Sequence, residues 1–171
     1  MTRMAQFVLL SVLLSLSGLA SLSAFAADLD SNRDGMIRVA FLSPPLQSGG
    51  IEALAICADL ENMIKASTPG KPVRVTHESI THSRTLMGWW YHPDSQAARA
   101  QLFAGHYDLL LMAEDDEIVR GYPEFYFEGV RAVTREARTI GIRTALVQMV
   151  KPGNTFRDTR VQAVAETVYR V

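Results

Sequence analysis

The chain has 171 residues, of which 48% are hydrophobic, and its 17 basic and 18 acidic side chains give a formal net charge of −1. A charge so close to zero offers no electrostatic footprint for nucleic acid, so we expect no such partner. The single cysteine, Cys57, excludes an internal disulfide bond. It lies in an apolar helical pattern, which favours a buried thiol over a catalytic one, because a catalytic thiol needs an exposed, polar setting.

Residues 1–26 have the pattern of a secretory signal peptide. Arg3 precedes the apolar run Phe7–Ala20, and Ala24-Phe25-Ala26 offers a small-x-small cleavage site. The alternative is an N-terminal membrane anchor, which needs ~20 consecutive apolar residues, whereas serine and glycine interrupt this run. We therefore expect a secreted or periplasmic protein with no stable membrane anchor after cleavage.

Residues 27–35 are expected to form a polar leader before the folded domain. Asp30, Asn32 and Asp34, followed by Gly35, match the first half of a calcium-binding loop. The acid that such a loop needs at its twelfth position is Phe41 here. A turn before a strand explains the same residues, so we expect no metal.

The rest of the chain alternates between apolar runs typical of buried strands and longer segments with helical periodicity. An irregular loop rich in His, Trp and Tyr is expected between the second strand and the second helix. The predicted strands are Met36–Leu42, Val73–Glu78, Tyr107–Met112 and Ile142–Val150, the predicted helices are Gly50–Ala66, Asp94–Ala104, Pro123–Ile140 and Phe156–Val171, and the predicted loop is Thr81–Pro93.

Strands that alternate with helices predict right-handed crossovers and a parallel sheet covered on both faces. We therefore expect a single three-layer α/β/α domain over residues 36–171, with a sheet of four or five strands. The predicted domain ends on a helix at Val171, so it can be incomplete at its carboxyl end.

The loop after the first strand is the expected place for chemistry, because ligands of α/β proteins bind at the carboxyl ends of the strands. Ser43 and Ser48 are the candidate nucleophiles there, and His82, after the second strand, is the candidate base. Gln47 and Gly49 lie at the predicted start of a helix, which favours an anion or an oxyanion. The alternative is structural: a flexible turn, with Ser48 as a helix cap.

Two further groups are candidate substrate-binding residues. Trp89, Trp90 and Tyr91 could stack on a ligand ring, or fill the core at the edge of the sheet. Glu114 and Asp115 open an acidic run at the exit of the third strand. A metal held there together with His82 is less favoured than a solvated acidic loop.

The order of these elements resembles that of the secreted SGNH (GDSL-like) hydrolases. The likeness rests on IRVAFLSPPLQSGG, VRVTHESITHSRTLMGWW, YDLLLMAEDDE and the helix followed by GIRTALVQM. It implies a flavodoxin-like three-layer fold and the activity of a serine esterase or lipase on acyl or carbohydrate esters. It also implies Gly88 as a loose match to the family's second oxyanion donor.

The chain departs from the family pattern at the catalytic motifs. The family's Gly-Asp/Asn-Ser turn is Ser43-Pro44-Pro45 here, and proline carries neither a hydroxyl nor a backbone N–H. The family's asparagine after the third strand corresponds to the acidic run that begins at Glu114, and no Asp-x-x-His pair follows.

We therefore expect an exported SGNH-hydrolase-like protein with a degenerate or incomplete ester-hydrolysing site, which acts on a small molecule and uses no cofactor. The alternative is a non-catalytic periplasmic module that binds a small carbohydrate through Trp89, Trp90 and Tyr91. A flavin or nucleotide binder ranks last, because the chain lacks a glycine-rich phosphate loop.

Overall fold

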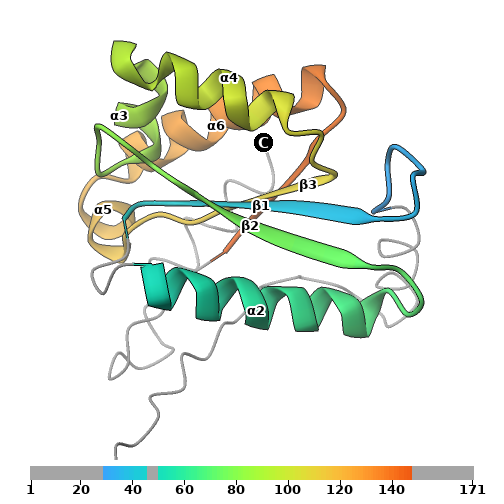
Figure 1. Cartoon of the computed structure of the whole chain (residues 1–171). Coiled ribbons are helices and arrows are strands. Elements are labelled where there is room, and N and C mark those ends of the chain that lie inside the picture. The colour runs from blue at the N-terminus through green and yellow to red at the C-terminus, as the bar shows by residue number, and fades with distance from the viewer. Residues whose placement is uncertain (1–28, 46–49, 148–171) are drawn as a thin grey trace, which may run out of the picture.

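The protein folds around one parallel sheet with the strand order β2-β1-β3-β4 (Figure 1). The computed structural model describes residues 29–45 and 50–147. The predicted signal peptide, residues 46–49 and the predicted last helix lie outside this part of the chain. The strands are β1 (Ile37–Ser43), β2 (Val73–Ser79), β3 (Leu109–Met112) and β4 (Arg143–Leu146).

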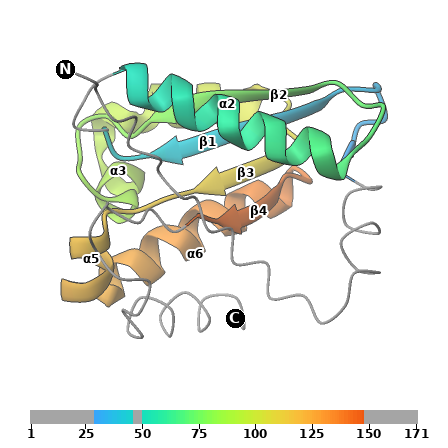
Figure 2. The same cartoon turned by 90° about the horizontal axis from the view of Figure 1, so that it is seen from below.

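Helices cover both faces of the sheet, which confirms the predicted three-layer α/β fold. α2 lies along one face, and α3, α4 and α6 cover the other (Figures 1 and 2). The strand order is that of the first four strands of a flavodoxin-like sheet. The helices are α2 (Gly50–Ser67), α3 (Leu86–Tyr91), α4 (Gln96–Ala104), α5 (Asp116–Gly121) and α6 (Pro123–Thr139), with a 3₁₀ turn at Pro93–Ser95.

Alternation along the strands divides the core into two clusters, one on each face of the sheet. Ile37, Val39 and Phe41 of β1 belong to the cluster beneath α2. Ala40 and Leu42 belong to the cluster on the opposite face. Because β1 is buried on both faces, its sequence is apolar from Val39 to Leu42, with Arg38 the one charged residue of the strand.

The topology places a switch point at the carboxyl ends of β1 and β3. These strands are neighbours, yet β1 leads into α2 on one face while β3 leads toward α6 on the other. Such a switch point is where open α/β sheets bind their ligands. The side chains near Ser43 and Glu114 therefore occupy the expected edge of the sheet.

The predicted loop Thr81–Pro93 contains the helix α3, so this part of the prediction is wrong. Thr85 caps the helix, with its side-chain oxygen accepting from the backbone N–H of Gly88 at 2.9 Å. α3 packs against α6 at Gly129, where an added Cβ would lie 2.5 Å from the backbone nitrogen of Met87. Tertiary packing thus stabilises a six-residue helix whose sequence shows little helical periodicity.

One predicted helix start and one predicted loop also need correction. α4 begins at Gln96 rather than Asp94, because Pro93 opens a 3₁₀ turn and Nδ1 of His92 accepts from the backbone N–H of Asp94. The acidic run after β3 is not simply a loop. Asp115 caps α5 by accepting from the backbone N–H of Glu117 at 2.9 Å.

The polar leader is attached to the amino ends of the strands. Leu29 is buried in the cluster beneath α2. The buried carboxylate of Asp108 accepts from the backbone N–H of Ser31 (3.0 Å), from its hydroxyl (2.8 Å) and from the backbone N–H of Arg38 (2.8 Å). One side chain before β3 therefore joins the leader to β1.

Some leader residues match the pattern of a calcium-binding loop. In the structure, their side chains form hydrogen bonds with other groups of the protein. Oδ2 of Asp30 accepts from the backbone N–H of Gly35 and from Nζ of Lys71, each at 3.1 Å. Oδ1 of Asn32 accepts from the backbone N–H of Asp34. Within residues 29–45 and 50–147, no three His, Cys, Asp or Glu side chains gather as metal ligands would.

Candidate functional site

Ser43 and His77 meet at the carboxyl end of the sheet. Oγ of Ser43 lies 2.9 Å from Nε2 of His77. β1 and β2 are parallel, and His77 pairs in register with Phe41, two residues before Ser43. The two side chains therefore project from the same face of neighbouring strands, one step apart, toward the layer of α2.

The surroundings of His77 keep its imidazole neutral near pH 7. Burial lowers the pKa of His77 below its usual value, and the neighbouring carboxylate of Glu78 opposes this effect only in part. Phe41 packs against the imidazole ring, with the centroids 5.7 Å apart. A neutral ring can accept a proton at Nε2, which is the nitrogen that faces Ser43.

The hydroxyl of Ser43 has a second partner. Oγ also donates to the carbonyl oxygen of Pro44, at 3.1 Å. A serine carries one hydroxyl proton, so it can point to His77 or to Pro44 but not to both at once. Among the residues that the structure describes, no carboxylate hydrogen-bonds to Nδ1 of His77, so these two residues form a pair rather than a triad.

α2 begins at Gly50, seven residues beyond the end of β1. The amino end of an 18-residue helix carries partial positive charge and favours anions. It therefore lies near the exit of the strand that carries Ser43. Three of the predicted site residues, Gln47, Ser48 and Gly49, fall outside the described part of the chain.

Glu114 lies at the same edge of the sheet as Ser43, but its side chain contacts α3, in the layer opposite α2. It is 5% exposed, and its Oε2 accepts from the backbone N–H of Leu86 at 2.7 Å. Its Oε1 accepts from the backbone N–H of Asp115 at 3.1 Å. Burial raises the pKa of Glu114 to about 7, although both hydrogen bonds favour the carboxylate.

The three predicted aromatic ligand residues have different surroundings. Trp89 is 1% exposed and belongs to the core. Trp90 packs against that core and lies under the guanidinium of Arg99, 5.6 Å from the ring centroid. Tyr91 is 62% exposed. Only Tyr91, of the three, presents most of its ring to a ligand.

His82 and Gly88 also have partners of their own. The His82 ring stacks on His92, with the centroids 5.6 Å apart, and its backbone has a positive φ of 62°. The backbone N–H of Gly88 donates to Thr85. The structure thus pairs Ser43 with His77, which sequence reasoning counted only as a strand residue.

A signal for His77 was present in the sequence. Ser43 and His77 each lie near the end of a predicted strand, and consecutive strands joined by one helix are usually neighbours. Register decides whether two such side chains meet, and here it pairs Phe41 with His77, two residues before Ser43. The sequence favours His82 as the base only because it lies in the loop after the strand, where the sites of α/β proteins form.

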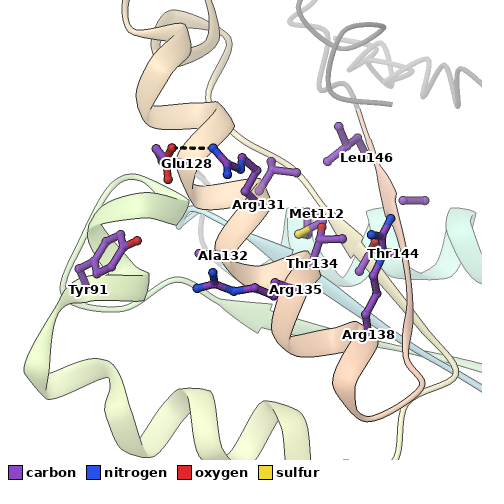
Figure 3. Close-up of a pocket in the computed structure, with 12 residues that line it drawn as sticks. Tyr91, Met112, Glu128, Arg131, Ala132, Thr134, Arg135, Arg138, Thr144 and Leu146 are labelled. Atoms are coloured by element: carbon purple, nitrogen blue, oxygen red, sulfur yellow. Dashed lines mark hydrogen bonds and ion pairs between the residues drawn. The ribbon is translucent and has the colours of Figure 1, made fainter. Parts of the chain in front are cut away.

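A separate hollow of about 480 Å³ lies over α6 and β4 (Figure 3). α6 contributes charged and small residues, and β4 contributes the end of the sheet. Its lining consists of Tyr91, Met112, Glu128, Val130, Arg131, Ala132, Thr134, Arg135, Arg138, Thr144, Ala145 and Leu146.

Comparisons of the chain with protein-family models, with curated proteins and with solved structures found no match. In the described part of the chain, no helix combines the length and the apolar character of a membrane span. The functional argument therefore rests on the site itself.

Proposed function

We propose that the protein is an ester hydrolase of the SGNH-like type, with Ser43 as the nucleophile and His77 as the base. The observation that carries the proposal is the 2.9 Å contact between Oγ of Ser43 and Nε2 of His77 at the carboxyl end of the sheet. A nucleophile and a base within hydrogen-bond distance are the minimum requirement for acyl transfer by serine.

The contact supports a two-step reaction. Nε2 of His77 takes the hydroxyl proton while Oγ of Ser43 attacks the ester carbonyl carbon, and the carbonyl oxygen becomes an oxyanion. The bond to the alcohol then breaks, and the alcohol leaves with the proton from Nε2. Water repeats the same sequence on the acylated Ser43, which releases the acid and restores the serine.

Few groups in the described residues are placed to stabilise the oxyanion. The residue after the nucleophile is Pro44, which has no backbone N–H to donate. The amino end of α2 supplies partial positive charge near the exit of β1. With no carboxylate on His77 in the described residues, we expect slow turnover, since loss of the orienting carboxylate costs about 10⁴-fold in serine proteases.

Burial indicates which esters can react. Ser43 is 1% exposed, so a bulky acyl group cannot approach Oγ without displacing neighbouring atoms. We therefore expect the enzyme to act on small acyl groups, such as acetyl, and on esters with good leaving groups.

Labelling with a fluorophosphonate that carries only small alkyl groups, as the buried serine requires, tests the proposal. We expect the intact mass of the protein to increase by one adduct, and peptide mapping to place that adduct on Ser43. Ser43→Ala should abolish labelling and hydrolysis of p-nitrophenyl acetate, and His77→Gln should slow both. Ser79→Ala is the matched control, since Ser79 is the register partner of Ser43 but is exposed, and its hydroxyl forms no hydrogen bond with His77.

The opposite result has a clear meaning. If folded wild-type protein takes no adduct, or if Ser43→Ala is labelled as fast as wild type, Ser43 is not a nucleophile. The non-catalytic binding module would then be the better description.

A further inference from the structure

The hollow over α6 and β4 lies on the opposite face of the sheet from Ser43. It is lined by Met112 and Leu146, which belong to the core cluster under α3 and α6. Ser43 and His77 project toward the layer of α2 instead. A ligand in this hollow would therefore be separated from the serine site by the sheet.

Three arginines on α6 border the hollow. Arg131, Arg135 and Arg138 follow one another at spacings of four and three residues, so they are neighbours on the helix surface. Like charges at these spacings repel and weaken a helix. The whole chain carries a net charge of −1, so this basic cluster is a local feature.

Only part of that charge is balanced within the described residues. Nη1 of Arg131 forms an ion pair with Oε1 of Glu128, at 3.1 Å. Neither Arg135 nor Arg138 forms an ion pair in the described part of the chain. The negative end of the helix dipole favours a cation in the last turn, which accounts for Arg138 but not for Arg135 in the preceding turn.

The rest of the lining is suited to an amphipathic ligand. Figure 3 shows Arg138 extending from α6 toward β4, where Thr144 lies, and Arg135 extending toward the side of Tyr91. The side chains of Met112, Val130, Ala132 and Leu146 give the hollow an apolar floor. A volume of about 480 Å³ is in the range of small-molecule sites.

We propose that this hollow binds a small organic anion, with its oxyanion held by Arg138 beside Thr144 and its apolar body on the floor of the hollow. The planar guanidinium of arginine matches the geometry of a carboxylate or a phosphate. A bound oxyanion would also balance the charge of Arg138, which forms no ion pair in the described part of the chain. The site is distinct from the proposed ester hydrolase activity.

Calorimetric titration with octanoate, octyl phosphate and octanol tests this site. We expect saturable binding of the two anions and none of octanol. The tighter of the two anions identifies the head group as a carboxylate or a phosphate. Replacing the unpaired arginines together, as Arg135→Gln with Arg138→Gln, should raise the Kd at least tenfold. The control variant Arg84→Gln, at an exposed arginine outside the hollow, should leave the Kd unchanged.

Several outcomes would overturn the proposal. Octanol binding as tightly as the anions would reduce the site to an apolar surface. An unchanged Kd in the double variant, or no saturable binding of either anion by folded wild type, would reject it outright. Ser43→Ala should bind both anions normally, so failure of the serine proposal and failure of this one are distinguishable.

Discussion

Glu114, at the end of β3, accepts a hydrogen bond from the backbone N–H of Leu86, the first residue of α3, over 2.7 Å. The carboxyl group is buried, and its second oxygen accepts from the backbone N–H of Asp115. One side chain thus joins the carboxyl edge of the sheet to a helix in the neighbouring layer. Because burial raises the pKa of Glu114 to about 7, this link changes its charge close to neutral pH.

The stability of the fold should depend on the charge of Glu114. Its pKa rises from an ordinary 4.5 to about 7 on folding, so between these values the native state binds more protons than the unfolded state. The contribution of Glu114 to stability is therefore fully present below pH 4.5 and is lost as the pH rises toward 7. A shift of this size corresponds to roughly 3 kcal/mol.

Glu114→Gln should remove that dependence. We expect the variant to gain stability relative to wild type at pH 8 and to gain little at pH 5, measured as urea midpoints at each pH. Glu136→Gln, at an exposed position on α6, is the control and should leave the pH profile unchanged. If the wild-type profile is flat between pH 4.5 and 7, Glu114 does not titrate as stated.

The pH profile of fluorophosphonate labelling should report His77. The base acts in its neutral form, so labelling of Ser43 should rise with pH and level off, with a midpoint below the ordinary histidine value of 6.5. The carboxylate of Glu78 raises the pKa of His77, so Glu78→Gln should move the midpoint lower still. A midpoint above 7 would assign the base to another group.

Gly129 should be intolerant of alanine. A Cβ there would lie 2.5 Å from the backbone nitrogen of Met87 and 2.7 Å from Cβ of Leu86, so α3 and α6 would have to separate. Gly129→Ala should cost about 1–3 kcal/mol, although glycine to alanine in a helix normally gains about 1 kcal/mol. Urea denaturation measures the change.

Gly121→Ala is the matched control for this substitution. Gly121 is the last residue of α5, and no atom lies within 4 Å of the Cβ that alanine would add. This variant should be neutral or slightly stabilised. Equal stability of the two variants would mean that α3 and α6 can separate at no cost.

Asp108→Asn should release the leader. The carboxylate accepts from both donors of Ser31 and from the backbone N–H of Arg38, and an amide offers only one oxygen to them. We expect a loss of about 2–4 kcal/mol and faster hydrogen exchange at residues 29–35. Asp59→Asn, at an exposed position on α2, should change neither quantity.

Much of the fold was predictable from the sequence, because the spacing of apolar residues and the length of each segment distinguish strands from helices. β1 and β2 follow their apolar runs closely, and Gly141, with φ of 81°, ends the run of α6 as predicted. α3 was not predictable in this way. Its six residues are held by Thr85, Glu114 and the close approach at Gly129, which are all contacts of the folded state.

The candidate site was predictable only in part. The topology predicts that Ser43 lies at the exit of β1, and therefore at the carboxyl edge of the sheet. Its partner depends on strand register, which a single sequence does not specify. Glu114 accepts from the first backbone N–H of α3, and Asp115 is the N-cap of α5, so these two roles appear only once the helices have formed.

The attachment of the leader at Asp108 would set an order of events if the predicted signal peptide is cleaved. With a cut after Ala26, only Ala27 and Asp28 would separate the cut from Leu29, whose side chain is buried. Two extended residues span about 7 Å, so the folded domain would hold the cut close to its own surface and would hinder a peptidase. The partners of the leader, Arg38 and Asp108, are brought together only when β1 pairs with β3. Removal of the signal would therefore be fastest before the sheet assembles.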